Sequence, residues 1–311
     1  MTWKRAKYLK ENGEAETKYP MYLKIQSPDP FDYNHTLRYL RRSELELLHR
    51  VKENQVVKLV ECKGEKVLLR LEFENDRLKL LVDPASGRFA KNDVIQLITE
   101  WLDLGAPLVD FYQAVGQEPL FAPLIKAHYG MRMVRVPDLF EALAWSIIGQ
   151  QINLRFAYQV KHQLVKYAGD FVDSRGERHF LFPSPDRVLS ISDQSFRSMQ
   201  FSRQKITYLR NVAALMVAGA LCKEQLLSLE PEEAKRALME IKGIGNWSAN
   251  YVMMRCLGWK EAFPLEDAGL HQALRKHMNL NQKLTLAEVR RLTSTWGHWK
   301  AYRTYYLWQS L

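Results

Sequence analysis

The spacing of apolar residues changes once along this chain, and that change limits the possible folds more than any other feature. Between residues 55 and 83, apolar and polar side chains alternate in two runs, Val67, Leu69, Leu71 and Phe73, then Leu78, Leu80 and Val82. This period of two is typical of antiparallel β-strands with one buried face. From about residue 94 onward the period becomes helical. The sequence therefore predicts a small antiparallel β-sheet followed by helices, an α+β fold.

The change in period also predicts two domains, a β-rich N-terminal domain at residues 1–92 and an all-helical region at residues 93–311. Within the first domain, the segment from Ser43 to Val51 has the pattern of a short helix. In the second domain the apolar period and the helix-ending signals predict a series of helices. These lie near residues 93–103, 119–129, 138–149, 153–168, 193–199, 203–219, 231–240, 246–257, 267–277, 286–296 and 299–310.

Cysteine content and apolar runs exclude several classes of protein. The three cysteines, Cys62, Cys222 and Cys256, are far apart, which excludes a disulfide framework and any four-cysteine zinc or iron–sulfur site. No apolar run reaches the roughly 18 residues that a membrane span needs. The first twenty residues carry five Lys/Arg and no apolar core, so we expect no secretory signal and a cytoplasmic protein.

The charge of the chain points to a polyanionic partner. The net charge is +10 and the pI is near 9.4, which favours nucleic acid over membrane. Residues 142–169 and 194–223 hold no acidic residue, and residues 268–311 hold only Glu288 against seven Lys/Arg. We expect these stretches to form a basic surface along a phosphate backbone. The alternative is that such gaps arise by chance in a basic protein.

Residues 238–251 are the most informative segment of the chain. Two glycines, Gly243 and Gly245, flank one apolar residue between predicted helices at 231–240 and 246–257. Glycines allow positive φ and close backbone approach, and free N–H groups in such a turn bind anions. A hairpin of this kind binds a DNA phosphate without reading the base sequence. The alternative is an ordinary turn between two helices.

This segment resembles the hairpin of the helix–hairpin–helix DNA glycosylases, and in particular the AlkA-type 3-methyladenine DNA glycosylase II. The resemblance covers about residues 137–311 well and the N-terminal domain only in order and general character. The matching pieces are Phe140–Leu143, Ile147–Gln151, Gly243–Tyr251, Pro264–Asp267, Trp296–Tyr302 and Trp308. It implies a helix–hairpin–helix glycosylase core of two helical subdomains with the cleft between them. It also implies that Lys242, Gly243 and Gly245 bind DNA phosphate.

Asp267 is the candidate catalytic residue. With Glu266, it precedes the predicted helix 267–277, where the helix dipole and free N–H groups stabilise a carboxylate. The alternative is that Asp267 only caps this helix. The resemblance assigns the catalytic aspartate of the family to Asp267. Breaking an N-glycosidic bond builds positive charge on the sugar, and a carboxylate about 4 Å away stabilises it by roughly 4 kcal/mol, about a thousandfold in rate.

An aromatic base pocket is implied by the resemblance at Trp247, Tyr251 and Trp308. An extruded base stacks on flat faces, and an alkylated, positively charged purine gains roughly 0.5–2 kcal/mol from cation–π attraction. The alternative is that these aromatic residues belong to the core. We expect that role for three others: Trp296, Trp299 and Tyr302.

The resemblance also makes Gln151 the candidate wedge that fills the gap left by the flipped base. The alternative is that residues 150–153 are only a polar loop between helices. Where some members of the superfamily carry a lysine that attacks the sugar, this chain has Trp247, which predicts a monofunctional enzyme. At Ala268 the AlkA-type pattern can carry a tyrosine, so the base preference stays open.

These observations lead to one main hypothesis for the function. We expect a monofunctional DNA glycosylase of base excision repair that flips out alkylated purines such as 3-methyladenine and hydrolyses the N-glycosidic bond. Its partner is double-stranded DNA with damaged bases, and we expect a nucleoid-associated monomer without membrane contact. The alternatives are a glycosylase for oxidised or deaminated bases and a non-catalytic helix–hairpin–helix DNA-binding module.

No metal or cofactor is expected from the residues themselves. The eight histidines form no HExxH or HxxxH pair and the chain has no P-loop, so a zinc hydrolase or an NTPase has no support. The resemblance leaves room for a monovalent cation at three hairpin carbonyls, those of Met239, Ile241 and Gly243.

Overall fold

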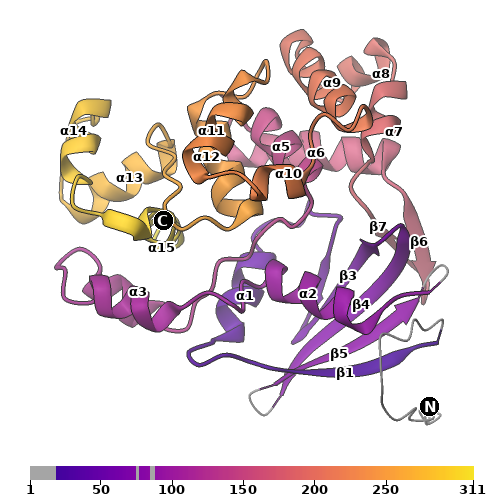
Figure 1. Ribbon diagram of the computed structural model, residues 1–311, viewed down its shortest axis with the longest axis horizontal. Coiled ribbons are helices and arrows are strands. Elements are labelled where there is room, and N and C mark those ends of the chain that lie inside the picture. Colours follow the sequence, from indigo (N-terminus) through magenta and orange to yellow (C-terminus); the bar gives the residue numbers. More distant parts are fainter. Residues whose placement is uncertain (1–18, 75–76, 85–87) are drawn as a thin grey trace.

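The computed structural model describes residues 19–74, 77–84 and 88–311. Residues 1–18, on which the expectation of a missing secretory signal depends, lie outside the described residues. The described chain forms an N-terminal antiparallel sheet followed by helices (Figure 1), which confirms the α+β fold. Within it, no helix is both long and apolar enough to cross a membrane.

The sheet has five strands in the order β1-β5-β4-β3-β2, all antiparallel. The strands are β1 (Met21–Gln26), β2 (Arg50–Lys52), β3 (Gln55–Cys62), β4 (Glu65–Glu74) and β5 (Arg77–Pro84). The alternating apolar residues predicted to face the core do so: Leu69 pairs with Val82 and Leu71 with Leu80, and all four are buried. Helix α1 (Tyr33–Leu40), which the sequence did not reveal, places Tyr33 over this face.

The other face of the sheet is also covered, in contrast to the single buried face that the alternation predicts. Val57, Leu59 and Leu68 form a second buried cluster against Val172 and Leu181. These last two residues belong to a hairpin of β6 (Phe171–Ser174) and β7 (Glu177–Phe180) and to the chain after it. This hairpin is the exception to the all-helical expectation for residues 93–311.

The predicted helix at Ser43–Val51 is wrong. Residues 43–49 form turns, and Val51 pairs with Val56 in the sheet. Side chains replace the helical hydrogen bonds, because Ser43 Oγ accepts from the N–H of Leu45, and Glu46 Oε1 accepts from that of Leu48. Leu48 is buried and Leu45 and Leu47 are half-buried, which gives the sequence the look of one helical face. In the structure, Leu45 packs against the main core, whereas Leu47 and Leu48 belong to a separate small cluster.

The helical region contains all of the helices that the sequence predicts, along with three it did not reveal: α3, α7 and α10. Their bounds are α2 (Lys91–Trp101), α3 (Leu108–Val115), α4 (Ala122–Ala127), α5 (Leu139–Ile148), α6 (Leu154–Ala168), α7 (Pro185–Ser190), α8 (Asp193–Ser198), α9 (Arg203–Val217), α10 (Lys223–Leu227), α11 (Pro231–Glu240), α12 (Asn246–Val252), the π-helical η1 (Met253–Leu257), α13 (Ala268–His277), α14 (Leu286–Leu292), the 3-10 turn η2 (Gly297–Trp299) and α15 (Lys300–Gln309).

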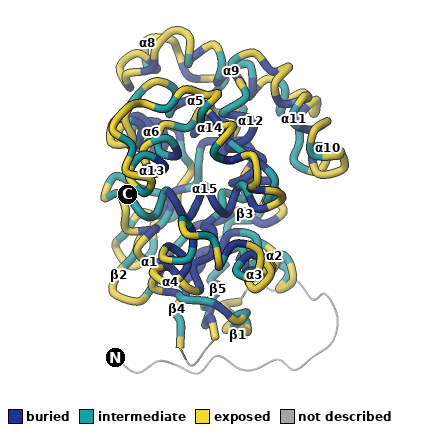
Figure 2. The backbone as a smooth tube through the Cα atoms, turned by 90° about the vertical axis from the view of Figure 1, so that its left-hand side faces the viewer, coloured by how far each residue is buried: buried dark blue, intermediate teal, exposed yellow. Residues whose placement is uncertain are grey.

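In Figure 1, helices α5 to α12 and helices α13 to α15 form two groups above the sheet, whereas α1, α2 and α3 lie at the level of the sheet. Helix α5 packs against α9 and α12, whereas α15 packs against α13 and α4. Figure 2 shows the buried backbone running through the middle of the molecule, with α8 and α10 at its exposed margin. As predicted, Trp296, Trp299 and Tyr302 are core residues. The division of the chain at residue 92 stays a prediction.

Candidate active site

Asp267 stands at the first turn of α13, half-buried, with its carboxylate held by three N–H groups. The backbone N–H of Leu270 donates to Oδ1 at 2.7 Å, so Asp267 is indeed the N-cap of the helix. The indole of Trp308 also donates to Oδ1 at 2.7 Å, and that of Trp247 donates to Oδ2 at 2.9 Å. These three hydrogen bonds fix the orientation of the carboxylate. Asp267 thus caps the helix and also accepts hydrogen bonds from two indoles, which capping alone does not require.

Glu266 next to it points to a different partner. Its carboxylate is exposed, and the side-chain amide of Asn246 donates to both of its oxygens at 2.8 Å. Adjacent residues at the start of a helix project in different directions. The structure therefore separates the two carboxylates, one among the tryptophans and one at the start of α12.

Two aromatic residues of the predicted base pocket, Trp247 and Trp308, contact Asp267, and the third, Tyr251, stacks on Trp247. Trp247 and Tyr251 both belong to α12, and their rings stack on each other, with centroids 5.6 Å apart and planes at 26°. Trp308 reaches the same carboxylate from α15. Sequence reasoning treated these rings as stacking surfaces and missed that two indoles donate to Asp267. One general rule pointed to these hydrogen bonds: the N–H of a buried indole needs an acceptor.

Gly269 is a further residue that the sequence did not reveal. A Cβ on Gly269 would lie 3.1 Å from Asp267 Oδ1 and 3.2 Å from the indole of Trp308. Both distances are tighter than ordinary van der Waals contact. The missing side chain therefore lets Trp308 approach the carboxylate. Ala268, between the two, is exposed.

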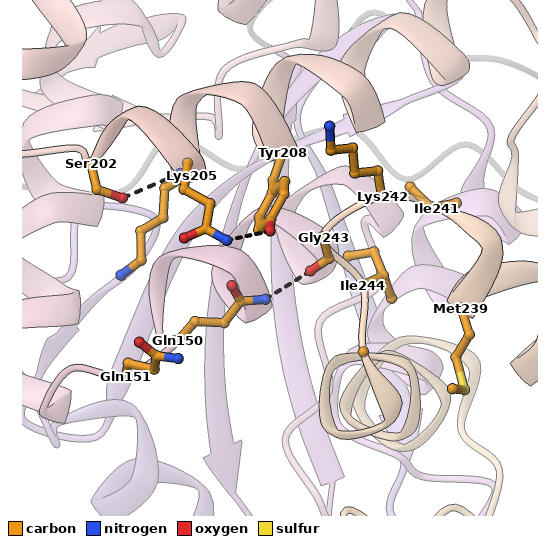
Figure 3. Close-up of a pocket in the computed structure, with 12 residues that line it drawn as sticks. Gln150, Gln151, Ser202, Lys205, Tyr208, Met239, Ile241, Lys242, Gly243 and Ile244 are labelled. Atoms are coloured by element: carbon orange, nitrogen blue, oxygen red, sulfur yellow. Dashed lines mark hydrogen bonds between the residues drawn. The ribbon is translucent and has the colours of Figure 1, made fainter.

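The hairpin forms one wall of an open groove of about 450 Å³. We call it the hairpin groove, and it is lined by Gln150, Gln151, Ser202, Gln204, Lys205, Tyr208, Met239 and residues 241–245 (Figure 3). Lys242, Gly243 and Gly245 all line it. The N–H groups of Gly243 and Gly245 donate to no group among the described residues. The groove thus offers free donors, as the prediction of phosphate binding requires.

Gly243 is required by its conformation and by its neighbour. Its φ is +102°, and a Cβ there would lie 2.2 Å from the ring of Tyr208. Residues other than glycine rarely adopt such a φ. The hairpin can therefore approach α9 as closely as it does only with glycine at this position.

The turn between α5 and α6 is fastened to the hairpin by Gln150. Its Nε2 donates to the carbonyl of Gly243 at 2.8 Å (Figure 3). It also donates to Ser248 Oγ at 3.3 Å. Gln151, the wedge candidate, is exposed at the tip of this turn with a φ of +57°. Lys205 donates to the carbonyl of Ile148 at 2.7 Å, and burial lowers its pKa. The wedge candidate thus stands on a turn held from two sides.

Some cations of the predicted basic surface are engaged inside the protein. Lys161 is buried between Glu46 and Glu141, at 3.0 and 2.9 Å. Burial opposes its charge, but Glu141 and Glu46 outweigh that effect and raise the pKa of Lys161. In the same way Arg303 pairs with Glu118, and Arg210 with Asp193. These three side chains are not free for DNA, so the predicted basic surface is smaller than the sequence indicates.

The hairpin carbonyls proposed for a monovalent cation are partly engaged. Gly243 O accepts from Gln150, and Ile241 O accepts from the N–H of Ile244 at 2.9 Å. A carbonyl oxygen has two lone pairs, so each retains one for a cation, and Met239 O would be the third ligand. The described residues contain no cluster of His, Cys, Asp and Glu suited to a metal ion.

Two parts of the chain match known protein families. Residues 144–298 match the HhH-GPD superfamily of base excision DNA repair proteins, and residues 22–138 match the AlkA N-terminal domain. The chain belongs to the HhH-GPD superfamily of base excision DNA repair proteins, in its branch with an AlkA-type N-terminal domain.

Two individual proteins and one solved structure are also similar to this chain. The chain is 33% identical over 291 residues to a DNA-3-methyladenine glycosylase of Bacillus subtilis, covering 92% of this chain and 96% of that protein. It is 26% identical to DNA-3-methyladenine glycosylase 2 of Escherichia coli, over 58% of this chain and 61% of that protein. The fold is similar to that of a 3-methyladenine DNA glycosylase from Archaeoglobus fulgidus, with a TM-score of 0.80, 23% identity and coverage of 92% and 97%.

Proposed function

We propose that this protein is a monofunctional DNA glycosylase that removes alkylated purines such as 3-methyladenine from double-stranded DNA. The observation that carries the proposal is the Asp267 carboxylate, which accepts from the indole of Trp247 on α12, the helix after the hairpin, and from that of Trp308 on α15. The Bacillus subtilis and Escherichia coli relatives are both named for 3-methyladenine, which supports this substrate for the present chain.

Asp267 acts through its fixed negative charge. As the bond between the sugar and the base breaks, the electron pair leaves with the base and positive charge develops at C1′. The carboxylate stabilises that charge, and because its donors fix it beforehand, it does not reorganise during the reaction. It also orients the water that adds to C1′. An alkylated purine carries a positive charge before the reaction and leaves as a neutral molecule, so no strong general acid is required.

The aromatic rings and the hairpin bind the substrate. The flipped base stacks on Trp247, Tyr251 and Trp308, whose electron-rich faces attract a cationic purine. Lys242 and the N–H groups of Gly243 and Gly245 bind the phosphate backbone, and Gln151 fills the gap in the duplex. We also propose that the protein acts as a monomer. We place it in the cytoplasm, at the nucleoid, and keep a monovalent cation at the hairpin carbonyls as part of the proposal.

The test is a gel assay with duplexes that each carry one lesion: 7-methylguanine, hypoxanthine, 8-oxoguanine or none. We expect release of the alkylated purine and an intact abasic strand that breaks only after alkali. Release from 8-oxoguanine alone would move the assignment to oxidised bases. Binding without release from any duplex would favour the DNA-binding module. A covalent adduct trapped with borohydride would contradict the monofunctional mechanism.

A further inference from the structure

Gln150 joins the turn that carries the wedge candidate to the hairpin that carries the phosphate-binding groups. It lies in residues 149–153 between α5 and α6, which we call the wedge turn. Its Nε2 donates to the carbonyl of Gly243 in the hairpin and to Ser248 Oγ in α12. The next residue in the wedge turn is Gln151. One side chain therefore connects the wedge turn to the hairpin and to the helix after it.

The peptide group between Gly243 and Ile244 is held from both sides. Its carbonyl accepts from Gln150 at 2.8 Å, and its N–H donates to the carbonyl of Ile241 at 2.9 Å. The N–H groups of Gly243 and Gly245, which donate to no group in the described part of the chain, belong to the peptide groups before and after it. Because a peptide group is planar and rotates as a unit, fixing the middle one restrains its neighbours. Gln150 therefore helps to direct the two free donors.

The conformation of Gly243 makes this support necessary. Glycine has more accessible backbone conformations than any other residue, and the φ of Gly243 is +102°. The ring of Tyr208 on α9 occupies the place of the missing side chain, since a Cβ there would lie 2.2 Å from it. Tyr208 and Gln150 thus reach Gly243 from two different elements and together hold the hairpin turn (Figure 3).

The wedge turn also needs support from outside. The φ of Gln151 is +57°, in the left-handed region that residues other than glycine rarely adopt. Such a conformation persists only where the surrounding structure determines it. Lys205 holds the end of α5 through the carbonyl of Ile148, and Gln150 holds the wedge turn to the hairpin. Without the hydrogen bonds of Gln150, Gln151 is free to return to an ordinary φ and to move away from the duplex.

We propose that Gln150 is a positioning residue that couples phosphate binding at the hairpin to insertion of Gln151 into the duplex. A phosphate bound to Gly243 and Gly245 holds the hairpin turn, the hairpin turn holds Gln150, and Gln150 keeps Gln151 in its left-handed conformation. The wedge is thus aligned where the hairpin has bound the backbone. The inference rests on the proposed function, because it uses the same phosphate donors and the same wedge.

This coupling assigns Gln150 to base flipping rather than to bond cleavage. Within the described chain its side chain donates to Gly243 and Ser248 and not to Asp267. Flipping costs most for a paired base and least for a base without a partner. Loss of Gln150 should therefore slow excision of a paired lesion far more than excision of an unpaired one.

The experiment measures single-turnover release of 7-methylguanine at saturating enzyme from two duplexes. In one the lesion is paired with cytosine, and in the other it lies opposite a tetrahydrofuran abasic-site analogue. Gln150→Met keeps the length of the side chain and removes its donor. Release from the paired duplex should fall about tenfold, as loss of one hydrogen bond predicts. Release from the unpaired duplex should fall by less than about threefold, and affinity for an undamaged duplex should weaken severalfold.

The matched control is Gln96→Met, which removes a glutamine amide at the level of the sheet. Gln96 is exposed on α2, and its amide donates to Glu100 rather than to the hairpin. Its rates and affinity should equal those of the wild type. The ratio of the rates on the two duplexes, taken from one preparation, is independent of the fraction of protein that is folded.

A double-mutant cycle with Gln151→Ala distinguishes coupling from a structural role. If Gln150 acts through the wedge, Gln150→Met should slow release from the paired duplex in the wild type but hardly further in the Gln151→Ala background. Losses that multiply in the double variant would overturn the coupling. Equal losses on the paired and unpaired duplexes would make Gln150 a structural residue only.

The remaining outcomes separate this inference from the proposed function. An unchanged affinity of Gln150→Met for undamaged DNA would mean that Gln150 does not support the hairpin donors, and would overturn the inference. A Gln151→Ala variant as active as the wild type would refute the wedge and the coupling and leave the glycosylase activity in place. Failure of the wild type to release the base from either duplex would refute the proposed function and the inference with it.

Discussion

The Asp267 centre and the hairpin groove both adjoin helix α12 and are built in opposite ways. At Asp267, both carboxylate oxygens accept hydrogen bonds from groups fixed in the protein. In the hairpin groove, Lys242 and Gly245 are exposed, and the N–H groups of the two glycines have no partner among the described residues. At Asp267 the hydrogen bonds to the carboxylate are thus already formed within the protein, whereas the N–H groups of the hairpin groove are free to bind a ligand.

The difference follows from the task of each region. A charge that stabilises a transition state is most effective when its surroundings do not rearrange during the reaction. A surface that holds a phosphate backbone gains from donors that are still free, and each contact contributes little. Substitutions at the Asp267 centre should therefore change the rate of excision, and substitutions in the groove should change affinity and its dependence on salt.

The largest effect is expected from Asp267→Asn. Removal of the charge should lower single-turnover excision by a factor on the order of a thousand. DNA affinity should persist or rise, because a negative charge near phosphates is lost. In the Asp267→Asn variant, the new NH₂ group faces an indole N–H, which then has no acceptor. Loss of this hydrogen bond costs about 1 kcal/mol of the free energy of unfolding.

Melting temperature and binding affinity separate these effects for Asp267→Asn. Normal excision would leave Asp267 as a helix cap alone. A loss explained by unfolding would make the residue structural and would revive the DNA-binding module.

A smaller effect is expected from Trp308→Phe, which keeps a ring and removes one donor to the carboxylate. Without this hydrogen bond the carboxylate is less firmly oriented, and the excision rate at saturating enzyme should fall about tenfold, equivalent to about 1.4 kcal/mol. DNA affinity should stay close to that of the wild type. Trp299→Phe is a matched control, since Trp299 packs in the core. A loss of affinity with an unchanged rate would mean that Trp308 acts only as a stacking surface.

Much of the fold could be predicted from the sequence, because apolar periodicity reports burial. The strands around Leu69 and Leu80 and the helices α6 and α9 follow this period closely. The hairpin β6–β7 could not be found in this way, since its strands are short and largely polar and are positioned by the sheet face that they cover. The segment at Ser43 has leucines at helical spacing that are buried or half-buried, but they lie on turns, so there the apolar period predicted a helix that does not form.

The parts of the candidate site that lie within short sequence motifs could be predicted. Residues 243–245 are recognisable from their glycines, and Asp267 from its place before a helix. The indole donors and the close approach at Gly269 depend on contacts between parts of the chain up to 41 residues apart, from Asp267 to Trp308. No local pattern encodes such contacts. Likewise, Lys161 looks like a surface cation until the fold brings Glu46 and Glu141 to it.

In the hairpin groove, Lys242→Ala should weaken DNA binding severalfold and leave the rate at saturating enzyme unchanged. Loss of one phosphate contact should reduce the slope of log affinity against log salt by about 0.9. The matched control is Lys24→Ala on strand β1, which lies far from α11 and α12 in Figure 1. If the two variants show the same salt dependence, Lys242 makes no phosphate contact.

The smallest effect is expected from Glu266→Gln, which removes a charge next to Asp267 in sequence but from a different surface. Glu266 is exposed and accepts from Asn246 rather than from the indoles. In water its charge acts weakly on a sugar held at Asp267, because exposed charges are screened. Excision should change by less than about threefold, and binding should tighten slightly at low salt. Single-turnover rates beside those of Asp267→Asn check this. A loss as large as that of Asp267→Asn would show that both carboxylates act on the sugar, and the separation of the two side chains seen here would not explain catalysis.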